Sequence, residues 1–252
     1  MRPALRIAIL ECDTPPERID TKYNGLYGIF IKLFSESATE LNNPDLLNPQ
    51  NNGLDIARYD VVTKQEYPDL ESVDAILMTG SKHNSFDDDP WILKLVEYTK
   101  KALESERVKI VGICFGHQIL ARAMGVRVGR NAEGWEIAVC DVELSEKGKE
   151  LFGVEVLKIQ QMHRDIVFSL PPDTISLGSS PRCEVQGMYR PGKFITLQGH
   201  PEYRGDIVRE SVNLRAAAGI FDKEQAEDAL RRAEKPHDGV KMGVAILKFL
   251  ME

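Results

Sequence analysis

Apolar residues follow two different spacings in the first half of the chain. Continuous apolar runs predict buried strands at residues 5–12, 54–62, 73–80 and 108–113. Between these runs, apolar residues three and four positions apart predict amphipathic helices at residues 23–35, from Pro90 onwards and after Gly116. Because strands and helices alternate, we expect an α/β fold with a doubly wound, mostly parallel sheet and helices on both of its faces.

The pattern changes after Gly125. Short strands separated by glycine and proline turns are predicted at residues 126–129, 135–144, 154–161, 175–179, 184–189 and 194–198. They predict a small mixed or antiparallel sheet added to the parallel core. Helices are predicted at residues 207–218, 223–233 and 240–250, and a surface loop rich in Asn and Pro at residues 41–53. Since no repeat or linker interrupts the chain, residues 1–252 are expected to form a single domain.

Composition narrows the classes of function. The chain has 252 residues and a formal net charge of −7, which argues against binding of nucleic acid or of anionic membranes. Neither a signal peptide nor an apolar run long enough to span a bilayer is recognised. The cysteines (Cys12, Cys114, Cys140 and Cys183) form no CxxC pair, so neither a zinc site nor a disulfide framework is expected. These features fit a reducing, cytoplasmic location.

The acidic run Asp87-Asp88-Asp89 has two interpretations. A cluster of carboxylates can hold a metal ion, but no second group of carboxylates or histidines accompanies this run. We interpret it as a solvated loop in which Asp89 caps the helix that begins at Pro90. No metal and no cofactor is therefore expected.

Candidate chemistry centres on the segment Gly112-Ile113-Cys114-Phe115-Gly116. A predicted strand leads into it and a predicted helix follows, so Cys114 stands at the apex of a strand–turn–helix. This is the pattern of a nucleophile elbow with sulfur as the nucleophile. Glycines two positions on either side allow the sharp turn, and the positive end of the helix favours a thiolate. The alternative is an inert cysteine, because free cysteines are often buried.

A cysteine nucleophile needs a base, and the segment Gln198-Gly199-His200-Pro201-Glu202 carries the candidate with the most suitable spacing. Residues i and i+2 of an extended chain point to the same side, so His200 and Glu202 are expected to project together from the end of a strand. Cys114, His200 and Glu202 would then serve as nucleophile, base and a carboxylate that orients the base.

The other histidines have simpler interpretations. His83, on the loop after Gly80, could line a pocket, but we expect it to be an exposed polar residue. We expect His117, beside the nucleophile, to make structural hydrogen bonds. His163 is a candidate for contact with a substrate, mainly through its backbone. His237 is interpreted as a turn residue.

Two strings carry a resemblance to a known family. Gly-Ile-Cys-Phe-Gly-His-Gln around Cys114, with the later Gln-Gly-His-Pro-Glu around His200, resembles the class I glutamine amidotransferases of the triad type. The resemblance covers most of the chain and implies a flavodoxin-like core. It also implies that Cys114 attacks the γ-amide of a glutamine-like substrate and forms a γ-glutamyl thioester that water resolves. His200 would act as base and then as acid, while Glu202 holds its tautomer.

The resemblance further implies how a substrate is held. The expected oxyanion donors are the backbone amides of Phe115 and of Gly80 or Ser81. Gln118 matches the family position that contacts the glutamyl part of the substrate. Met162 and His163 belong to a segment that resembles the one whose backbone grips the amino-acid end.

Two loops depart from the family pattern. Thr79-Gly80-Ser81-Lys82-His83-Asn84 replaces the usual Pro-Gly-Gly-Pro, and Met162-His163-Arg164 replaces Ser-His-Gly. These loops, together with Asp88-Asp89-Pro90-Trp91 and Gly134-Trp135-Glu136, are closer to the stand-alone branch of the family. That branch includes γ-glutamyl peptidases acting on glutathione-type conjugates.

Three functional hypotheses follow. The first is a cysteine hydrolase that works alone on a small-molecule γ-glutamyl substrate, such as glutamine, a γ-glutamyl peptide or a glutathione-type conjugate. The second is an ammonia-supplying glutaminase subunit that needs a separate synthetase partner, and the third is a non-catalytic relative with a binding role. The intact Cys114, His200 and Glu202 argue against the third, and the lack of a synthetase domain or Gly-rich phosphate loop favours the first over the second. A homodimer is compatible with the sequence.

Overall fold

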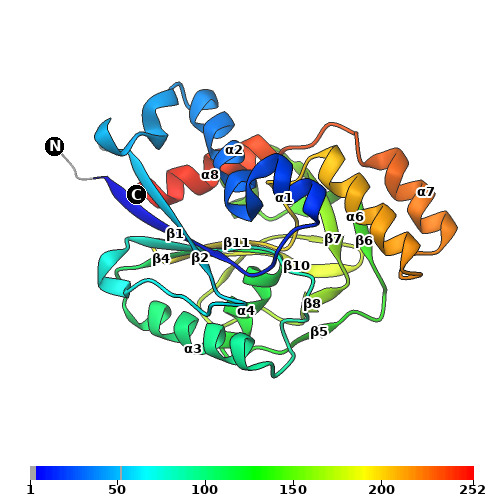
Figure 1. Cartoon of the computed structure of the whole chain (residues 1–252), viewed down its shortest axis with the longest axis horizontal. Helices are drawn as coiled ribbons and strands as arrows, with labels where there is room; N and C mark the ends of the chain where they lie inside the picture. Colours follow the sequence, from blue (N-terminus) through cyan, green and yellow to red (C-terminus); the bar gives the residue numbers. More distant parts are fainter. Residues whose placement is uncertain (1–3, 52) are drawn as a thin grey trace.

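Nine strands form one continuous sheet in the computed structural model, which describes residues 4–51 and 53–252 (Figure 1). Parallel strands follow one another in the order β2 (Leu54–Asp60), β1 (Leu5–Glu11), β3 (Ala75–Met78), β4 (Lys109–Ile113) and β11 (Phe194–Leu197). This is the strand order of the flavodoxin-like doubly wound fold, and it confirms the predicted fold class.

The predicted antiparallel strands extend this same sheet. They follow β11 in the order β10 (Cys183–Arg190), β9 (Ile175–Ser180), β6 (Glu136–Leu144) and β7 (Val156–His163). Within the described ranges, only β5 (Val128–Arg130) and β8 (Asp165–Val167) form a separate two-stranded sheet. The predicted addition of antiparallel strands to the parallel core is therefore confirmed. Most of these strands continue the same sheet beyond the edge strand of the core.

Helices cover both faces of the sheet because buried side chains alternate along β1. Ile7 and Ile9 belong to one cluster of core residues, whereas Ala8 and Leu10 belong to another. The helices on the first face are α2 (Gly25–Glu40), α5 (Glu146–Phe152) and α8 (Gly239–Met251). Those on the second face are α3 (Pro90–Glu104) and α4 (Phe115–Ala123), drawn below the sheet in Figure 1.

The remaining helices are α1 (Glu17–Tyr23), α6 (Gly205–Ala217) and α7 (Lys223–Arg232). Helices α6 and α7 pack on each other, and α7 packs on β6, at the antiparallel end of the sheet (Figure 1). Ile19 of α1, Ile29 of α2 and Ile207 of α6 form a small apolar cluster that joins these helices near the end of the parallel strands. Across the described parts of the chain, no helix combines the length and the apolar character needed to cross a lipid bilayer.

Helix boundaries differ from the sequence pattern at the N-terminal end. The helix predicted at residues 23–35 corresponds to α2, which begins at Gly25, and the sequence pattern does not predict α1, which ends at Tyr23. Asn24 and Gly25, with φ values of 61° and 81°, separate the two helices. The predicted loop at residues 41–53 contains short 3₁₀ turns at Pro44–Leu47 and Pro49–Asn51, and its Asn52 lies outside the described residues.

Two further helix starts depend on local chemistry. The sequence pattern does not predict α5, whose Lys- and Glu-rich sequence has few apolar positions. Ser145 marks its start, because the Ser145 hydroxyl accepts a 3.1 Å hydrogen bond from the Gly148 N–H. Asp89 occupies the predicted N-cap position of α3, but its side chain makes no capping hydrogen bond, and Pro90 follows at the first helical position.

Candidate active site

Cys114 lies between β4 and α4 at a strained turn. Its backbone has φ 51° and ψ −98°, which a non-glycine residue rarely adopts. The Cys114 N–H donates a 2.8 Å hydrogen bond to the Leu197 carbonyl of β11 and so ties the apex to the neighbouring strand. The residue is buried at the N-terminus of α4, with 5% of its surface exposed. The structure therefore has the predicted strand–turn–helix geometry around this thiol.

Close backbone contacts require both glycines of the elbow. A Cβ atom at Gly112 would lie 2.8 Å from the carbonyl carbon of Gly116. A Cβ atom at Gly116 would lie 2.4 Å from the carbonyl oxygen of Met78 in β3. Because both contacts are with backbone atoms, a side chain at either position would push the helix away from the sheet. These contacts confirm the steric reason for the Gly-x-Cys-x-Gly pattern.

His200 and Glu202 contact each other directly, with the imidazole Nδ1 2.8 Å from the carboxylate Oε1. Both side chains are buried. The reason for the contact differs from the predicted one, because β11 ends at Leu197 and the pair lies on the turn that follows rather than on an extended strand. The His200 N–H donates a 2.8 Å hydrogen bond to the Gln160 carbonyl of β7, which holds the turn in place.

The environment of His200 favours its protonated form. Burial alone would lower the pKa of the imidazole, but the nearby charges of Glu202 and Cys114, and hydrogen bonds to both side chains, raise this pKa to about 10. The ring of Tyr203 stacks on the imidazole, with the ring centroids 3.8 Å apart. His200 and Cys114 line the same cavity, so this arrangement places a charged proton donor and a nucleophilic sulfur in one site.

Gly80 lies against the side chains of His200 and Cys114. A Cβ atom at this position would be 2.6 Å from His200 Cε1 and 3.6 Å from Cys114 Cβ. Only a residue without a side chain leaves room for the imidazole there. Gly80, Ser81 and Phe115, whose amides are the expected oxyanion donors, line the same cavity as Cys114.

Gln198, for which the sequence pattern predicts no role, contacts the nucleophile. Its Nε2 lies 3.6 Å from Cys114 Sγ, and its Oε1 accepts a 3.1 Å hydrogen bond from Gln118 Nε2. The Gln118 side chain also donates to the Asp165 carbonyl at 2.9 Å and accepts from the Ser85 hydroxyl at 2.9 Å. Gln118 therefore orients Gln198, and its own amide is already engaged within the protein. The available signal was the position of Gln198, two residues before His200 at the end of a predicted strand.

One cavity of about 950 Å³ brings most of the candidate residues together. Its lining includes Cys114, His200, Gly80, Ser81, Phe115, Gln118, Met162 and His163. Glu202 is the one candidate residue outside the lining. His83 also lines the cavity, half-buried and with its ring edge-on to Trp91 at 5.1 Å, so the expectation of an exposed loop residue is wrong.

Comparison with known proteins places this chain in a family. Residues 50–211 match the family glutamine amidotransferase class-I. The chain belongs to the class I glutamine amidotransferases. This confirms the resemblance carried by the strings around Cys114 and His200.

Relatives of this class I glutamine amidotransferase span nearly its whole length. It is 38% identical over 251 residues to a glutamine amidotransferase-like protein of Schizosaccharomyces pombe, covering 98% of each chain. It is 31% identical over 229 residues to gamma-glutamyl peptidase 4 of Arabidopsis thaliana, covering 88% of this chain and 86% of the relative. The structure of a glutamine amidotransferase from Thermotoga maritima matches with a TM-score of 0.72 at 20% identity, over 98% of this chain and 99% of that one. The predicted relation to γ-glutamyl peptidases is thus confirmed, and so is the fold.

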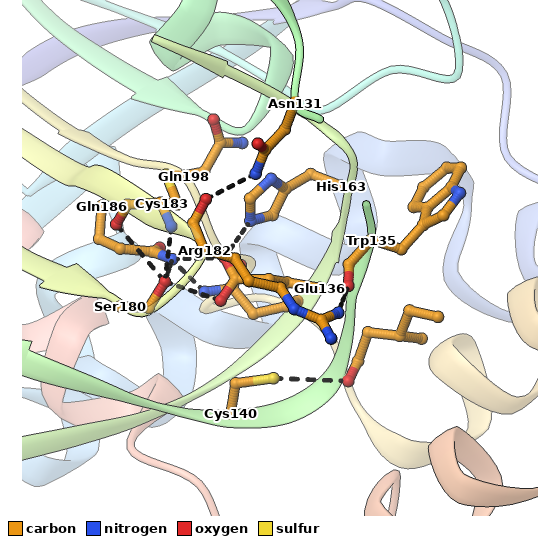
Figure 2. A network of polar contacts seen from close by, with 12 residues as sticks. Asn131, Trp135, Glu136, Cys140, His163, Ser180, Arg182, Cys183, Gln186 and Gln198 are labelled. Carbon is orange, nitrogen blue, oxygen red and sulfur yellow. Dashed lines mark hydrogen bonds and ion pairs between the residues drawn. The ribbon is translucent and has the colours of Figure 1, made fainter. Parts of the chain in front are cut away.

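A buried polar network holds the segment after β7 (Figure 2). His163 Nε2 lies 3.0 Å from Glu136 Oε2, and Ser180 and Gln186 each donate a 2.7 Å hydrogen bond to the same carboxylate. Burial would raise the pKa of Glu136, but its hydrogen bonds to these partners outweigh that effect and lower it. The other ring nitrogen of His163 lies 3.1 Å from the Asp165 carbonyl. The His163 side chain is therefore engaged within the protein, and its contact with a substrate through the backbone stays a prediction.

His117 has the structural position expected of it. The residue is fully buried, and its Nδ1 lies 2.8 Å from the Thr196 hydroxyl of β11. Burial lowers the pKa of His117 to about 3, so the ring is neutral at physiological pH. It therefore ties α4 to the sheet and adds no charge near the nucleophile.

Proposed function

We propose that this protein is a cysteine hydrolase that cleaves the γ-glutamyl amide bond of γ-glutamyl peptides or glutathione-type conjugates. The observation that carries the proposal is the buried His200, whose Nδ1 lies 2.8 Å from Glu202 and which lines the same cavity as Cys114. A nucleophile, a base and an orienting carboxylate in this arrangement can perform acyl transfer. The likeness to gamma-glutamyl peptidase 4 of Arabidopsis thaliana supports the choice of bond.

In the proposed reaction the Cys114 thiolate attacks the γ-carbonyl carbon and forms a carbon–sulfur bond. The backbone amides of Phe115 and of Gly80 or Ser81 stabilise the charge that develops on the carbonyl oxygen. The His200 imidazolium gives its proton to the leaving nitrogen as the carbon–nitrogen bond breaks, and a γ-glutamyl thioester remains. His200 then takes a proton from water, the water oxygen attacks the thioester, and glutamate leaves as the thiolate is restored.

The other candidate residues support these steps. Glu202 holds Nδ1 of the His200 ring and so leaves Nε2 for the proton transfers. Gln118 acts mainly by orienting Gln198, because its own side chain is engaged within the protein. Met162 and the backbone of His163 line the cavity and contact the glutamyl part of the substrate.

The cavity fits a substrate larger than glutamine. Its volume of about 950 Å³ is at the upper end of the range for small-molecule sites. Leu214 and Ile220 line it while remaining 48% and 50% exposed, so apolar surface faces solvent at its opening. Such surface suits an extended leaving group such as a peptide or an S-conjugate.

We further propose that residues 1–252 act as one domain, without a synthetase partner, in the cytoplasm. The helices after the triad, α6, α7 and α8, pack on the sheet or around the cavity, and the chain carries no phosphate-binding motif. Water is then the acceptor of the γ-glutamyl group. The cysteines are free thiols, which fits a reducing compartment.

A panel of substrates tests the proposal. The purified chain is assayed with glutamine, γ-glutamyl dipeptides, glutathione and glutathione S-conjugates, with glutamate and ammonia measured separately. We expect release of glutamate from at least one γ-glutamyl peptide or conjugate to be faster than release of ammonia from glutamine. Negligible activity on all of these peptides, with strong glutaminase activity once a co-purifying ATP-dependent enzyme is added, would instead support the partner-dependent subunit.

A further inference from the structure

Two arginines flank the indole ring of Trp135 in the wall of the cavity. The guanidinium carbon of Arg164 lies 5.5 Å from the ring centroid, and that of Arg215 lies 5.9 Å from it. Arg164 comes from the connection between β7 and β8, Trp135 immediately precedes β6, and Arg215 lies on α6. All three side chains line the cavity that contains Cys114. Three separate segments of the chain therefore converge on one cationic subsite, which we call the Trp135 clamp.

Other cationic side chains of the cavity wall already have carboxylate partners. Lys82 pairs with Asp13 at 2.9 Å, and Arg130 pairs with Asp165 at 3.0 Å. Their charges are therefore largely neutralised within the protein.

The two arginines of the Trp135 clamp lack such partners. Among the described residues, no carboxylate lies within ion-pair distance of Arg164 or Arg215, and the buried Nε of Arg164 has no hydrogen-bond acceptor. Arg215 donates one hydrogen bond of 3.3 Å, to the Ser211 carbonyl of its own helix. Guanidinium groups in a cavity wall that lack a carboxylate partner are suited to bind an anion from solution, and the planar fork matches a carboxylate.

The position of Arg215 indicates which part of a substrate would reach it. In the proposed function, His200 protonates the leaving nitrogen, so the leaving group must depart on the side of that imidazole. Tyr203 stacks on this imidazole at 3.8 Å. Tyr203 and Trp135 pack against one apolar cluster that includes Val208 and Val212 of α6, the helix that carries Arg215. The Trp135 clamp is thus on the leaving-group side of Cys114.

We propose that the Trp135 clamp binds the carboxylate of the leaving group, so that the preferred substrates are γ-glutamyl peptides with a free C-terminal carboxylate. This inference rests on the proposed function and names its substrate class. The clamp would distinguish a γ-glutamyl amino acid or peptide from glutamine, whose leaving group is uncharged ammonia. It also gives a physical role to Arg164, which stands where the family pattern has glycine.

A pair of substrates that differ only in this carboxylate tests the inference. γ-Glutamylglycine and γ-glutamylglycinamide share the glutamyl part and the scissile bond, but only the first has a charged leaving group. We expect wild-type protein to prefer γ-glutamylglycine, and Arg215→Met or Arg164→Met to lower its kcat/KM about 10- to 100-fold while changing that of the glycinamide by less than about 3-fold. Arg18→Met is the matched control, because the Arg18 side chain is 82% exposed and lies outside the cavity lining.

Two further measurements test whether the charge and the planar shape of the arginines cause the preference. Arg215→Lys retains the charge without the planar fork, so it should retain part of the preference. In wild-type protein, rising salt concentration should reduce the preference for γ-glutamylglycine over its amide. Equal losses for both substrates in Arg215→Met and Arg164→Met, or no loss, would overturn the inference while leaving the proposed hydrolase intact. Cleavage of neither substrate, nor of any other γ-glutamyl peptide, by wild-type protein would overturn both.

Discussion

The side-chain amide of Gln198 lies 3.6 Å from the sulfur of Cys114. Gln118 sets the orientation of that amide, because it donates a 3.1 Å hydrogen bond to Gln198 Oε1 and so directs Nε2 toward the thiol. The sulfur of the nucleophile therefore has an oriented N–H donor directly beside it.

We expect Gln198→Glu to slow alkylation of Cys114 by about tenfold or more, because a carboxylate of the same shape would place negative charge beside the sulfur. The rate is measured with iodoacetamide across a range of pH, and peptide mapping confirms the site. Gln50→Glu, an exposed change far from the site in sequence, serves as the control. Equal alkylation rates in wild type and Gln198→Glu would show that the amide does not influence the thiol.

Replacing Glu202 with glutamine should lower turnover while leaving the fold intact. The Glu202 carboxylate accepts from His200 Nδ1 at 2.8 Å, and an orienting carboxylate contributes up to about 10⁴-fold to kcat in a serine triad. His200→Ala should be at least as damaging. The measurements are kcat on the preferred γ-glutamyl substrate and the thermal midpoint of unfolding. Wild-type turnover in Glu202→Gln would mean that this carboxylate has no orienting role.

Stability should depend on His200 in a pH-dependent way. Its pKa rises from 6.5 to about 10 in the folded protein, so its stabilising contribution is complete below pH 6.5 and disappears as the pH rises through 10. We therefore expect His200→Gln to reduce the free energy of unfolding more at pH 6 than at pH 10, by at least about 1 kcal/mol. Urea denaturation at the two pH values measures the difference.

His237→Gln provides a contrast for that measurement. Burial lowers the pKa of His237, so folding disfavours its charged form, and its replacement should be better tolerated at low pH than at high pH. If both variants showed the same pH trend, the trend could not be attributed to the contacts of His200.

Gly80→Ala should reduce activity through the position of His200. The new methyl group would lie 2.6 Å from His200 Cε1, so the imidazole must move, and small displacements of catalytic groups can cost about 10²-fold in rate. Gly129→Ala is the matched control, because its added Cβ would be 3.4 Å from its nearest neighbour, Phe168. The kcat of both variants is compared with wild type. A fully active Gly80→Ala would contradict the close contact with the imidazole.

Local patterns in the sequence predicted much of the fold and the centre of the site. The continuous apolar run Ile7-Ala8-Ile9-Leu10 is visible in the sequence and predicts a strand whose two faces are both buried, as the structure shows. The elbow was predictable because its steric requirement falls on neighbours of Cys114 in sequence. These features depend on spacings of a few residues, which sequence patterns report directly.

Contacts between distant segments were not predictable from spacing. Gln118 and Gln198 are 80 positions apart, and Glu136 meets His163 only because β6 pairs with β7 in one particular register. The polar residues around His83 predict that its side chain is exposed to solvent. Its packing on Trp91 depends instead on how the loop folds over α3. Pairing of this kind is decided by tertiary structure.

The proposed γ-glutamyl thioester on Cys114 is tested most directly by acid quenching during turnover. Protein mixed with a γ-glutamyl dipeptide is quenched in the steady state, and the peptides that contain each cysteine are examined by mass spectrometry. Burial raises the pKa of Cys12 and of Cys183 to about 12 and also raises that of Cys140, so these thiols should remain unmodified. We expect a γ-glutamyl group on the Cys114 peptide alone, and neither adduct nor turnover in Cys114→Ala. Full turnover in Cys114→Ala, or cleavage by wild-type protein with adducts spread evenly over all four cysteines, would contradict a thioester mechanism at Cys114.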